Sequence, residues 1–174
     1  MSTTTFFTRL PSPLGELVLT ASGAALTAVF FPIRRHGPAP EAQPGWLEDD
    51  GRGPAGTVLA RARQQLSEYL ARTRTTFDLP LAPTGTPFQR RVWDALRAIP
   101  YGTTTSYGEL ARRLDGASAT RAVGAANGKN PIPIIVPCHR VVGARGELTG
   151  FGGGMDRKRW LLEHEGALMR LGRS

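Results

Sequence analysis

The sequence predicts two domains: an α/β N-terminal domain with a small antiparallel sheet over residues 1–80, and a mainly helical C-terminal domain over 86–174. The first half contains strand-like segments joined by short turns and one amphipathic helix. The second half contains several short helices with capping residues. Residues 81–85 contain Pro and Gly and are predicted to form the linker. A chain of 174 residues is long enough for two small domains.

Three strands are predicted near the start of the chain. Residues Phe6–Thr20 are typical of a β-hairpin, because apolar positions lie on both sides of the turn-forming segment Pro11–Gly15. A third strand is predicted over Ala25–Phe31, after the Ser22-Gly23 turn. No crossover of helical length separates these segments, so an antiparallel arrangement is expected.

The remainder of the first half is predicted as a loop, a helix and a short strand. Residues 37–56 are rich in Gly and Pro, which indicates a long surface loop that Trp46-Leu47 attaches to the domain. A helix is predicted over Val58–Leu70, where apolar residues recur with helical spacing. Phe77–Leu79 is predicted to form a last strand.

The second half has a helix start at each of four capping positions. Thr86 caps a helix that starts at Pro87 and ends before Pro100. The further caps and helices are Ser106 before Tyr107–Leu114, Ser118 before a helix to about Lys129, and Asp156 before a helix ending at Gly166. The second and third of these helices, joined by a Gly-containing turn, predict a helix-turn-helix.

The composition favours a polyanionic partner. The formal net charge is 22 − 14 = +8 and the isoelectric point is near 10.9, which favours nucleic acid, with a solvated cationic surface as the alternative. Since no stretch of about 18 apolar residues occurs, no membrane span is expected. Residues 1–5 carry no signal-peptide pattern, and a single cysteine fits a reducing compartment, so a cytoplasmic location is expected.

Cys138 is the only cysteine, and it is interpreted either as inert core or as a nucleophile. A buried extended segment over Ile132–Val136, stopped by Pro137, would place the thiol at a turn. His139 and Arg140 would favour the thiolate, which is the attacking species. Adjacent side chains of an extended chain point to opposite sides, so His139 would have to act through a bend or a bridging water.

Two further segments allow two interpretations each. The helix after Ser118 is thin on several sides because it carries Ala122, Gly124 and Ala125. These small residues indicate either close helix packing or a narrow element that enters a DNA groove, with Arg121 projecting. The glycine-rich residues 143–154 indicate either a plain surface loop or a backbone that approaches a flat ligand closely.

Residues 130–142, Asn-Pro-Ile-Pro-Ile-Ile-Val-Pro-Cys-His-Arg-Val-Val, resemble the active-site signature of the O6-alkylguanine-DNA alkyltransferases. The resemblance extends to Arg121–Gly124 and Leu161–Gly166, and it is strong over residues 86–166. It implies a winged-helix-like C-terminal domain and direct DNA repair without a cofactor. The alkyl group on O6 of guanine would pass irreversibly to Cys138 after base flipping, and each molecule would act once. Activity on O4 of thymine is left open.

The resemblance also implies roles for individual residues. The catalytic group would consist of Cys138, His139, Glu165 and Asn130, with a water relaying the thiol proton to His139 and Glu165 orienting the imidazole. DNA would be bound through the minor groove, by a monomer, with the residues Arg121, Tyr107, Ala122, Gly124 and Ala125. The base pocket would be lined by Val141, Phe151, Gly152, Gly153 and Pro133.

The chain departs from the family pattern at two points. Many relatives carry Tyr where this chain has Phe151, which keeps the flat ring and lacks the hydroxyl. Some relatives bind zinc in the N-terminal half through Cys and His ligands. This half has no cysteine and only His36, so no metal is expected.

Two other classes of function remain open on the residues alone. A helix-turn-helix regulator whose Cys138 senses oxidants or alkylators would bind a specific DNA sequence, which a general repair protein does not need. A Cys-His-Glu hydrolase would turn over an ester or amide many times.

Overall fold

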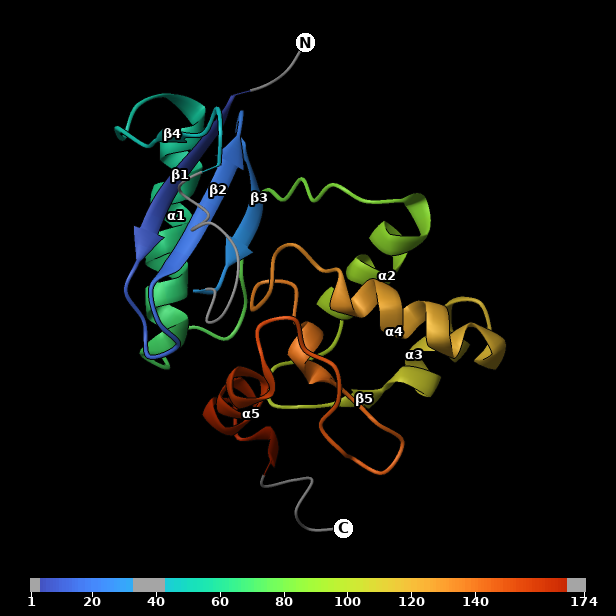
Figure 1. Cartoon of the computed structure of the whole chain (residues 1–174). Helices are drawn as coiled ribbons and strands as arrows, with labels where there is room; N and C mark the ends of the chain where they lie inside the picture. Colours follow the sequence, from blue (N-terminus) through green and yellow to red (C-terminus); the bar gives the residue numbers. More distant parts are fainter. Residues whose placement is uncertain (1–3, 33–42, 169–174) are drawn as a thin grey trace. The chain divides into compact units, whose positions relative to one another are not determined.

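The computed structural model describes residues 4–32 and 43–168 (Figure 1). The chain divides into two compact units, Met1–Thr84 and Gly85–Ser174. The boundary falls in the segment to which the sequence analysis assigns the linker. None of the helices in the described ranges is long and apolar enough to span a bilayer.

The first unit is built on a four-stranded sheet with the order β3-β2-β1-β4. Strands β1 (Thr5–Leu10), β2 (Leu17–Ser22) and β3 (Ala25–Phe30) confirm the three predicted strands, and each pairs antiparallel with its neighbour in sequence. The two-residue strand β4 (Leu47–Glu48) pairs parallel with β1. The sheet is therefore mixed, and the expectation of a purely antiparallel sheet is wrong at this edge.

Trp46 attaches the segment before β4 to the sheet, as predicted. Its ring centroid lies 6.4 Å from that of Phe7 and 5.6 Å from that of Phe30. The predicted loop 37–56 is interrupted by β4 and ends where helix α1 begins, at Gly53. Residues 33–42 of this region, including His36, lie outside the described residues.

Helix α1 (Gly53–Leu70) covers one face of the sheet (Figure 1). It begins five residues before the predicted start, because Pro54 lies in the first turn, where its missing N–H removes no helical hydrogen bond. The buried face confirms the predicted apolar spacing, and it consists mainly of Ala55, Val58, Leu59, Ala62, Leu66 and Tyr69.

The predicted strand Phe77–Leu79 is absent, because the side chain of Gln65 takes up the backbone groups of Asp78. Gln65 Nε2 donates to the Asp78 carbonyl at 3.0 Å, and the Asp78 N–H donates to Gln65 Oε1 at 2.9 Å. The segment after Asp78 reaches the sheet further along, at an isolated parallel bridge between Leu26 and Leu81.

The second unit begins with helix α2 (Pro87–Arg97), which confirms the predicted Thr86 cap. Thr86 and Gln89 form a capping box: the Gln89 N–H donates to Thr86 Oγ1 at 3.1 Å, and the Thr86 N–H donates to Gln89 Oε1 at 2.9 Å. The helix buries Val92, Trp93 and Leu96.

Helices α3 (Tyr107–Leu114) and α4 (Thr120–Gly128) pack on each other and on α2. Ser106 caps α3 as predicted, accepting from the Glu109 N–H at 3.0 Å. Ser118 does not cap α4, because it lies in a 3₁₀ turn, Ala117–Ala119, that precedes the helix. Trp93 donates from Nε1 to the Ala126 carbonyl at 2.8 Å and thereby ties α4 to α2.

Helix α5 (Met155–His164) begins after Gly154, and Glu165 is its C-cap. Asp156 is not its cap: Gly154, at φ 98°, occupies the cap position, and Asp156 lies in the first turn, where its charge favours the helix N-terminus. Gly166 follows the helix with φ 76°, as predicted for the helix end. The short strands β5 (Thr105–Ser106) and β6 (Val141–Val142) pair in parallel.

Candidate active site

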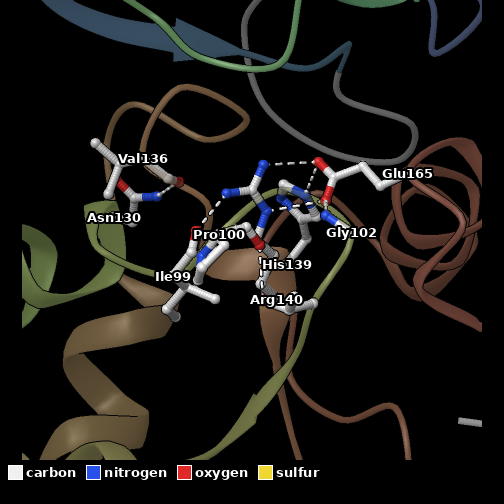
Figure 2. Close-up of polar contacts among 9 residues, drawn as sticks. Ile99, Pro100, Gly102, Asn130, Val136, His139, Arg140 and Glu165 are labelled. Atoms are coloured by element: carbon white, nitrogen blue, oxygen red, sulfur yellow. Dashed lines mark hydrogen bonds and ion pairs between the residues drawn. The ribbon is translucent and has the colours of Figure 1, made fainter. Parts of the chain in front are cut away.

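Cys138 follows a closed turn, and the predicted extended segment over Ile132–Val136 is wrong. The Val136 N–H donates to the Ile132 carbonyl at 2.9 Å, and Ile134 has a φ of 74°, a left-handed value that is uncommon for a β-branched residue. Asn130 closes the turn: its Nδ2 donates to the Val136 carbonyl at 2.8 Å (Figure 2). Its Oδ1 accepts from the Ile132 N–H at 3.0 Å. Cys138 then opens a 3₁₀ helix, Cys138–Arg140.

Glu165 is the centre of a buried charged cluster (Figure 2). Its Oε2 lies 2.8 Å from His139 Nε2 and accepts from Arg140 Nη2 at 3.0 Å, while its Oε1 accepts from Arg140 Nε at 2.9 Å. The Gly102 N–H also points to Oε1 at 3.4 Å. Arg140 is held from the other side by the Ile99 carbonyl, 2.6 Å from Nη1.

This cluster determines the protonation of His139. Burial alone raises the pKa of Glu165, but the hydrogen bonds from His139 and Arg140 outweigh burial and hold the pKa well below its usual range. Burial lowers the pKa of His139, whose ring is therefore neutral at pH 7 and donates from Nε2 to the carboxylate. Its other ring nitrogen, Nδ1, is buried and has no hydrogen-bond partner among the described residues. His139 thus presents a free acceptor nitrogen.

Cys138 is 4% exposed, and burial raises the pKa of its thiol to about 11. The Asn130 side chain and the charge of Lys158 oppose this shift only in part. Arg140 is not the source of the positive field that the sequence analysis expected, because its guanidinium is occupied by Glu165. At rest the thiol is protonated, so its proton has to leave during the reaction.

Lys158 is a fully buried residue that the sequence analysis missed. Its ammonium group donates to the carbonyls of Val141 and Thr149, both at 2.6 Å, and burial lowers its pKa to about 8. Tyr107 donates from its hydroxyl to the same Thr149 carbonyl at 2.9 Å. The sequence could have indicated that Lys158 is buried, because it has helical spacing with Leu161, Leu162 and Glu165. The structure buries all four residues.

The expected pocket residues lie on both sides of Cys138 in the sequence. Pro133 is buried in the turn before it, and Val141 is buried directly after the 3₁₀ helix. Phe151 and Gly153 are half-buried and Gly152 is exposed, in the loop that follows Thr149. A Cβ on Gly152 would lie 3.6 Å from the Gly128 carbonyl, so this loop approaches the end of α4.

The expected DNA-binding residues divide between two faces of α4. Arg121, Ala122 and Ala125 are exposed, whereas Gly124 faces the Tyr107 ring, which a Cβ there would approach to 3.8 Å. The small residues therefore serve close packing on one side and leave a smooth exposed surface on the other. Tyr107 is half-buried, and burial raises its pKa.

The described part of the chain contains no group of three or more His, Cys, Asp or Glu residues that could hold a metal ion. A buried thiol that is followed in sequence by a His–Glu–Arg cluster, in a unit that contains a helix-turn-helix pair, is the arrangement expected of a nucleic-acid-binding protein with a cysteine nucleophile.

Comparison with known proteins defines the family. The family model for the DNA-binding domain of 6-O-methylguanine DNA methyltransferase matches residues 87–167, and the model for the ribonuclease-like domain of the same enzyme matches residues 5–83. Together these matches cover most of the chain. The chain belongs to the 6-O-methylguanine DNA methyltransferase family.

Individual relatives and solved structures are similar to this chain over nearly its whole length. A methylated-DNA–protein-cysteine methyltransferase of Mycobacterium tuberculosis is 48% identical over 162 residues, covering 90% of this chain and 89% of the relative. That of Methanosarcina acetivorans is 42% identical, covering 93% of this chain and 99% of the relative. The crystal structure of M. tuberculosis O6-methylguanine methyltransferase matches with a TM-score of 0.81 at 45% identity, over 94% of this chain and 93% of that chain. M. tuberculosis OGT in complex with DNA matches with the same TM-score.

Replacing Glu165 with Gln is expected to lower both stability and reactivity. The change leaves the buried charge of Arg140 without its partner, which costs about 3–5 kcal/mol. Since the folded-state pKa of Glu165 lies below the unfolded value of about 4.3, its contribution is present above that pH and is lost as the pH falls. Urea unfolding between pH 3 and pH 7 measures this. The exposed neighbour Glu163→Gln is the control, and equal stability of the two variants at pH 7 would contradict the role of the cluster.

Replacing Lys158 with Met is expected to make the thiol less reactive. The variant loses the one charge that lowers the pKa of Cys138, so alkylation by iodoacetamide should slow at pH 7, in the part of the pH–rate curve where Lys158, with its pKa of about 8, is mostly charged. The exposed Arg159→Met is the control. An unchanged curve in folded Lys158→Met would show that this charge does not act on the thiol.

Proposed function

We propose that Cys138 is the residue that accepts the alkyl group in direct DNA repair, and that O6-alkylguanine is the substrate. The family to which the chain belongs repairs DNA by alkyl transfer. Cys138 is the only cysteine in the chain, and it lies next to the only described His–Glu pair that is buried. This juxtaposition is the observation that carries the assignment.

The reaction transfers the alkyl group from O6 of guanine to the sulfur of Cys138. The sulfur of Cys138 attacks the alkyl carbon, a C–S bond forms, and the bond from that carbon to O6 breaks. The thiol proton passes through one water to His139 Nδ1, the acceptor nitrogen that has no protein partner. The same proton returns from His139 through the water to the departing guanine, which leaves with hydrogen in place of the alkyl group, and His139 ends neutral. Because the product is a thioether and the chain has no second thiol, each molecule reacts once.

The supporting residues hold this geometry. Glu165 fixes the ring of His139, and Arg140 keeps Glu165 ionised, so that Nδ1 stays an unprotonated acceptor. Asn130 closes the turn before Cys138 and lowers the pKa of the thiol. We assign Val141, Pro133 and the loop 151–153 to the wall that receives the base.

The target base has to leave the duplex before the buried thiol can reach it, at a cost of a few kcal/mol. The exposed face of α4, with Arg121, Ala122 and Ala125, supports contact with DNA, and we place it in the minor groove. Arg121 fills the space left by the extruded base. Tyr107, next to Gly124, supports the neighbouring phosphate.

Residues 86–174 carry DNA binding and alkyl transfer, since all the assigned residues lie in this half of the chain. One chain supplies the whole site, so the protein acts as a monomer. We place it in the cytoplasm, where a lone thiol stays reduced. A sequence-specific regulator is disfavoured, because it gives no role to the buried His139–Glu165 pair.

Intact mass spectrometry tests the acceptor. Incubation with an oligonucleotide that contains O6-methylguanine should add about one methylene to Cys138 and stop at one group per chain, because the thioether is not released. Cys138→Ser should stay unmodified. Release of free alkyl product over many turnovers would favour a hydrolase.

Replacing Arg121 with Ala tests whether this residue acts on the alkyl transfer itself or on the extrusion of the base from the duplex. The variant should react with free O6-benzylguanine at the parental rate and more slowly with duplex DNA, since Arg121 only holds the gap left by the base. The loss should be smaller on single-stranded DNA, where less stacking is broken. The exposed Arg63→Ala in the first unit is the control. Equal losses on duplex and single-stranded substrates would contradict the base-flipping role.

A further inference from the structure

The turn Pro100–Thr103, which follows the end of α2, is a segment to which the proposed reaction gives no role. The Thr103 N–H closes the turn on the Pro100 carbonyl at 3.2 Å, and the Thr103 hydroxyl donates to the same carbonyl at 2.7 Å. Gly102 has a φ of 77°, the left-handed value that the third position of a type II turn needs. The turn alone therefore explains the glycine, and a further role has to come from what the turn contacts.

The segment that contains this turn holds one side of Arg140. The carbonyl of Ile99, directly before the turn, accepts from Arg140 Nη1 at 2.6 Å. The ring of the half-buried Tyr101 lies against the same guanidinium, with Arg140 Cζ 5.7 Å from the ring centroid, an arrangement that favours Arg over an aromatic face. Figure 2 shows the guanidinium of Arg140 between Ile99 and Glu165. Arg140 is therefore fixed from two directions.

Gly102 contacts Glu165 through both the side chain and the main chain of that residue. Its N–H donates to Glu165 Oε1 at 3.4 Å, which is longer than the usual range of about 2.7–3.2 Å. A Cβ on Gly102 would lie 3.1 Å from the main-chain carbonyl oxygen of Glu165, so close that the Glu165 main chain would have to shift. The position of Glu165 therefore depends on the absence of a side chain at residue 102.

The acceptor sites of the Glu165 carboxylate, about four in number, are all used by the described residues. Oε2 faces His139 Nε2 and Arg140 Nη2, and Oε1 faces Arg140 Nε and the Gly102 N–H. These contacts fix the orientation of the carboxylate, and the carboxylate in turn selects the tautomer of His139. A displaced Arg140 or Glu165 would therefore change which ring nitrogen of His139 carries the hydrogen.

We propose that Tyr101 and Gly102 are positioning residues for alkyl transfer. The ring of Tyr101 fixes Arg140, and Gly102 leaves room for Glu165, so that together they hold the carboxylate that keeps Nδ1 of His139 free of a hydrogen. Neither is a catalytic residue, because each acts through Arg140 or Glu165. The proposal rests on the proposed function, in which His139 receives the thiol proton.

Replacing Tyr101 with Leu tests the ring, and Tyr101→Phe, which keeps the ring, is the matched variant. Tyr101→Leu should take the alkyl group from free O6-benzylguanine about tenfold more slowly, because the group that orients the histidine is no longer fixed. Tyr101→Phe should restore the parental rate. The free base excludes any contribution of DNA contacts.

The tautomer of His139 gives a readout that a mere loss of stability would not change. The chemical shifts of the ring nitrogens in ¹⁵N NMR distinguish hydrogen on Nε2 from hydrogen on Nδ1. The chain has three histidines, so the spectrum of His139→Gln identifies the signals of this ring. The parent and Tyr101→Phe should carry the hydrogen on Nε2, and Tyr101→Leu should show both tautomers.

Replacing Gly102 with Ala tests the contact with Glu165. The methyl group should displace the Glu165 main chain, so the variant should react more slowly and show both tautomers of His139. Gly51→Ala in the first unit is the control, because Gly51 has a similar φ of 80° and a Cβ there would meet nothing within 4 Å. It carries the same backbone strain and should keep the parental rate.

The outcomes are distinct once urea unfolding has verified that each variant is folded. A parental rate for Tyr101→Leu, or a slow rate with the parental tautomer, would overturn the proposal. So would a Tyr101→Phe variant as slow as Tyr101→Leu, or a Gly102→Ala variant as fast as Gly51→Ala. If the parent protein transfers no alkyl group to Cys138, the proposed function itself fails, whereas the tautomer measurement still shows whether the turn positions His139.

Discussion

The buried carboxylate of Glu165 is the interaction on which the rest of the site depends. It is the counter-ion of the buried Arg140 and the hydrogen-bond acceptor of His139, so one charge holds two side chains in place. Without this carboxylate, the buried charge of Arg140 and the buried N–H at Nε2 of His139 would have no acceptor of opposite charge. The same carboxylate joins the end of α5 to the 3₁₀ helix that begins with Cys138, and so closes the second unit around the thiol.

The site combines a buried thiol with a histidine ring that Glu165 already orients. Burial keeps Cys138 protonated, which protects the only thiol from casual electrophiles. Lys158 moderates this effect and holds two carbonyls of the loop that follows the nucleophile. Under the proposed function, a buried and protonated thiol suits a protein whose nucleophile is consumed in one reaction, because it reacts only with a group that enters the site.

Local chemistry predicted the caps of α2 and α3 correctly but not those assigned to Ser118 and Asp156, and the elements that depend on distant partners were predicted wrongly. The caps of α2 and α3 could be identified from Thr86 and Ser106 because a cap needs only residues within one turn. The strand expected at Phe77–Leu79 failed because Gln65, thirteen positions from Asp78, takes up its backbone groups. The turn before Cys138 was mistaken for a strand, since Ile132–Val136 has strand composition and only the Asn130 side chain closes it.

The sequence by itself determined the family, through the signature around the single cysteine, and it named Cys138 and His139 as the residues to which we assign the chemistry. The tertiary structure decided how these residues are used. It paired Arg140 with Glu165, 25 positions apart, buried Lys158 close enough to Cys138 for its charge to act on the thiol, and closed the turn before Cys138 with the Asn130 side chain. These decisions are invisible in sequence because a charge or an amide acts through distance and burial, and folding alone sets both.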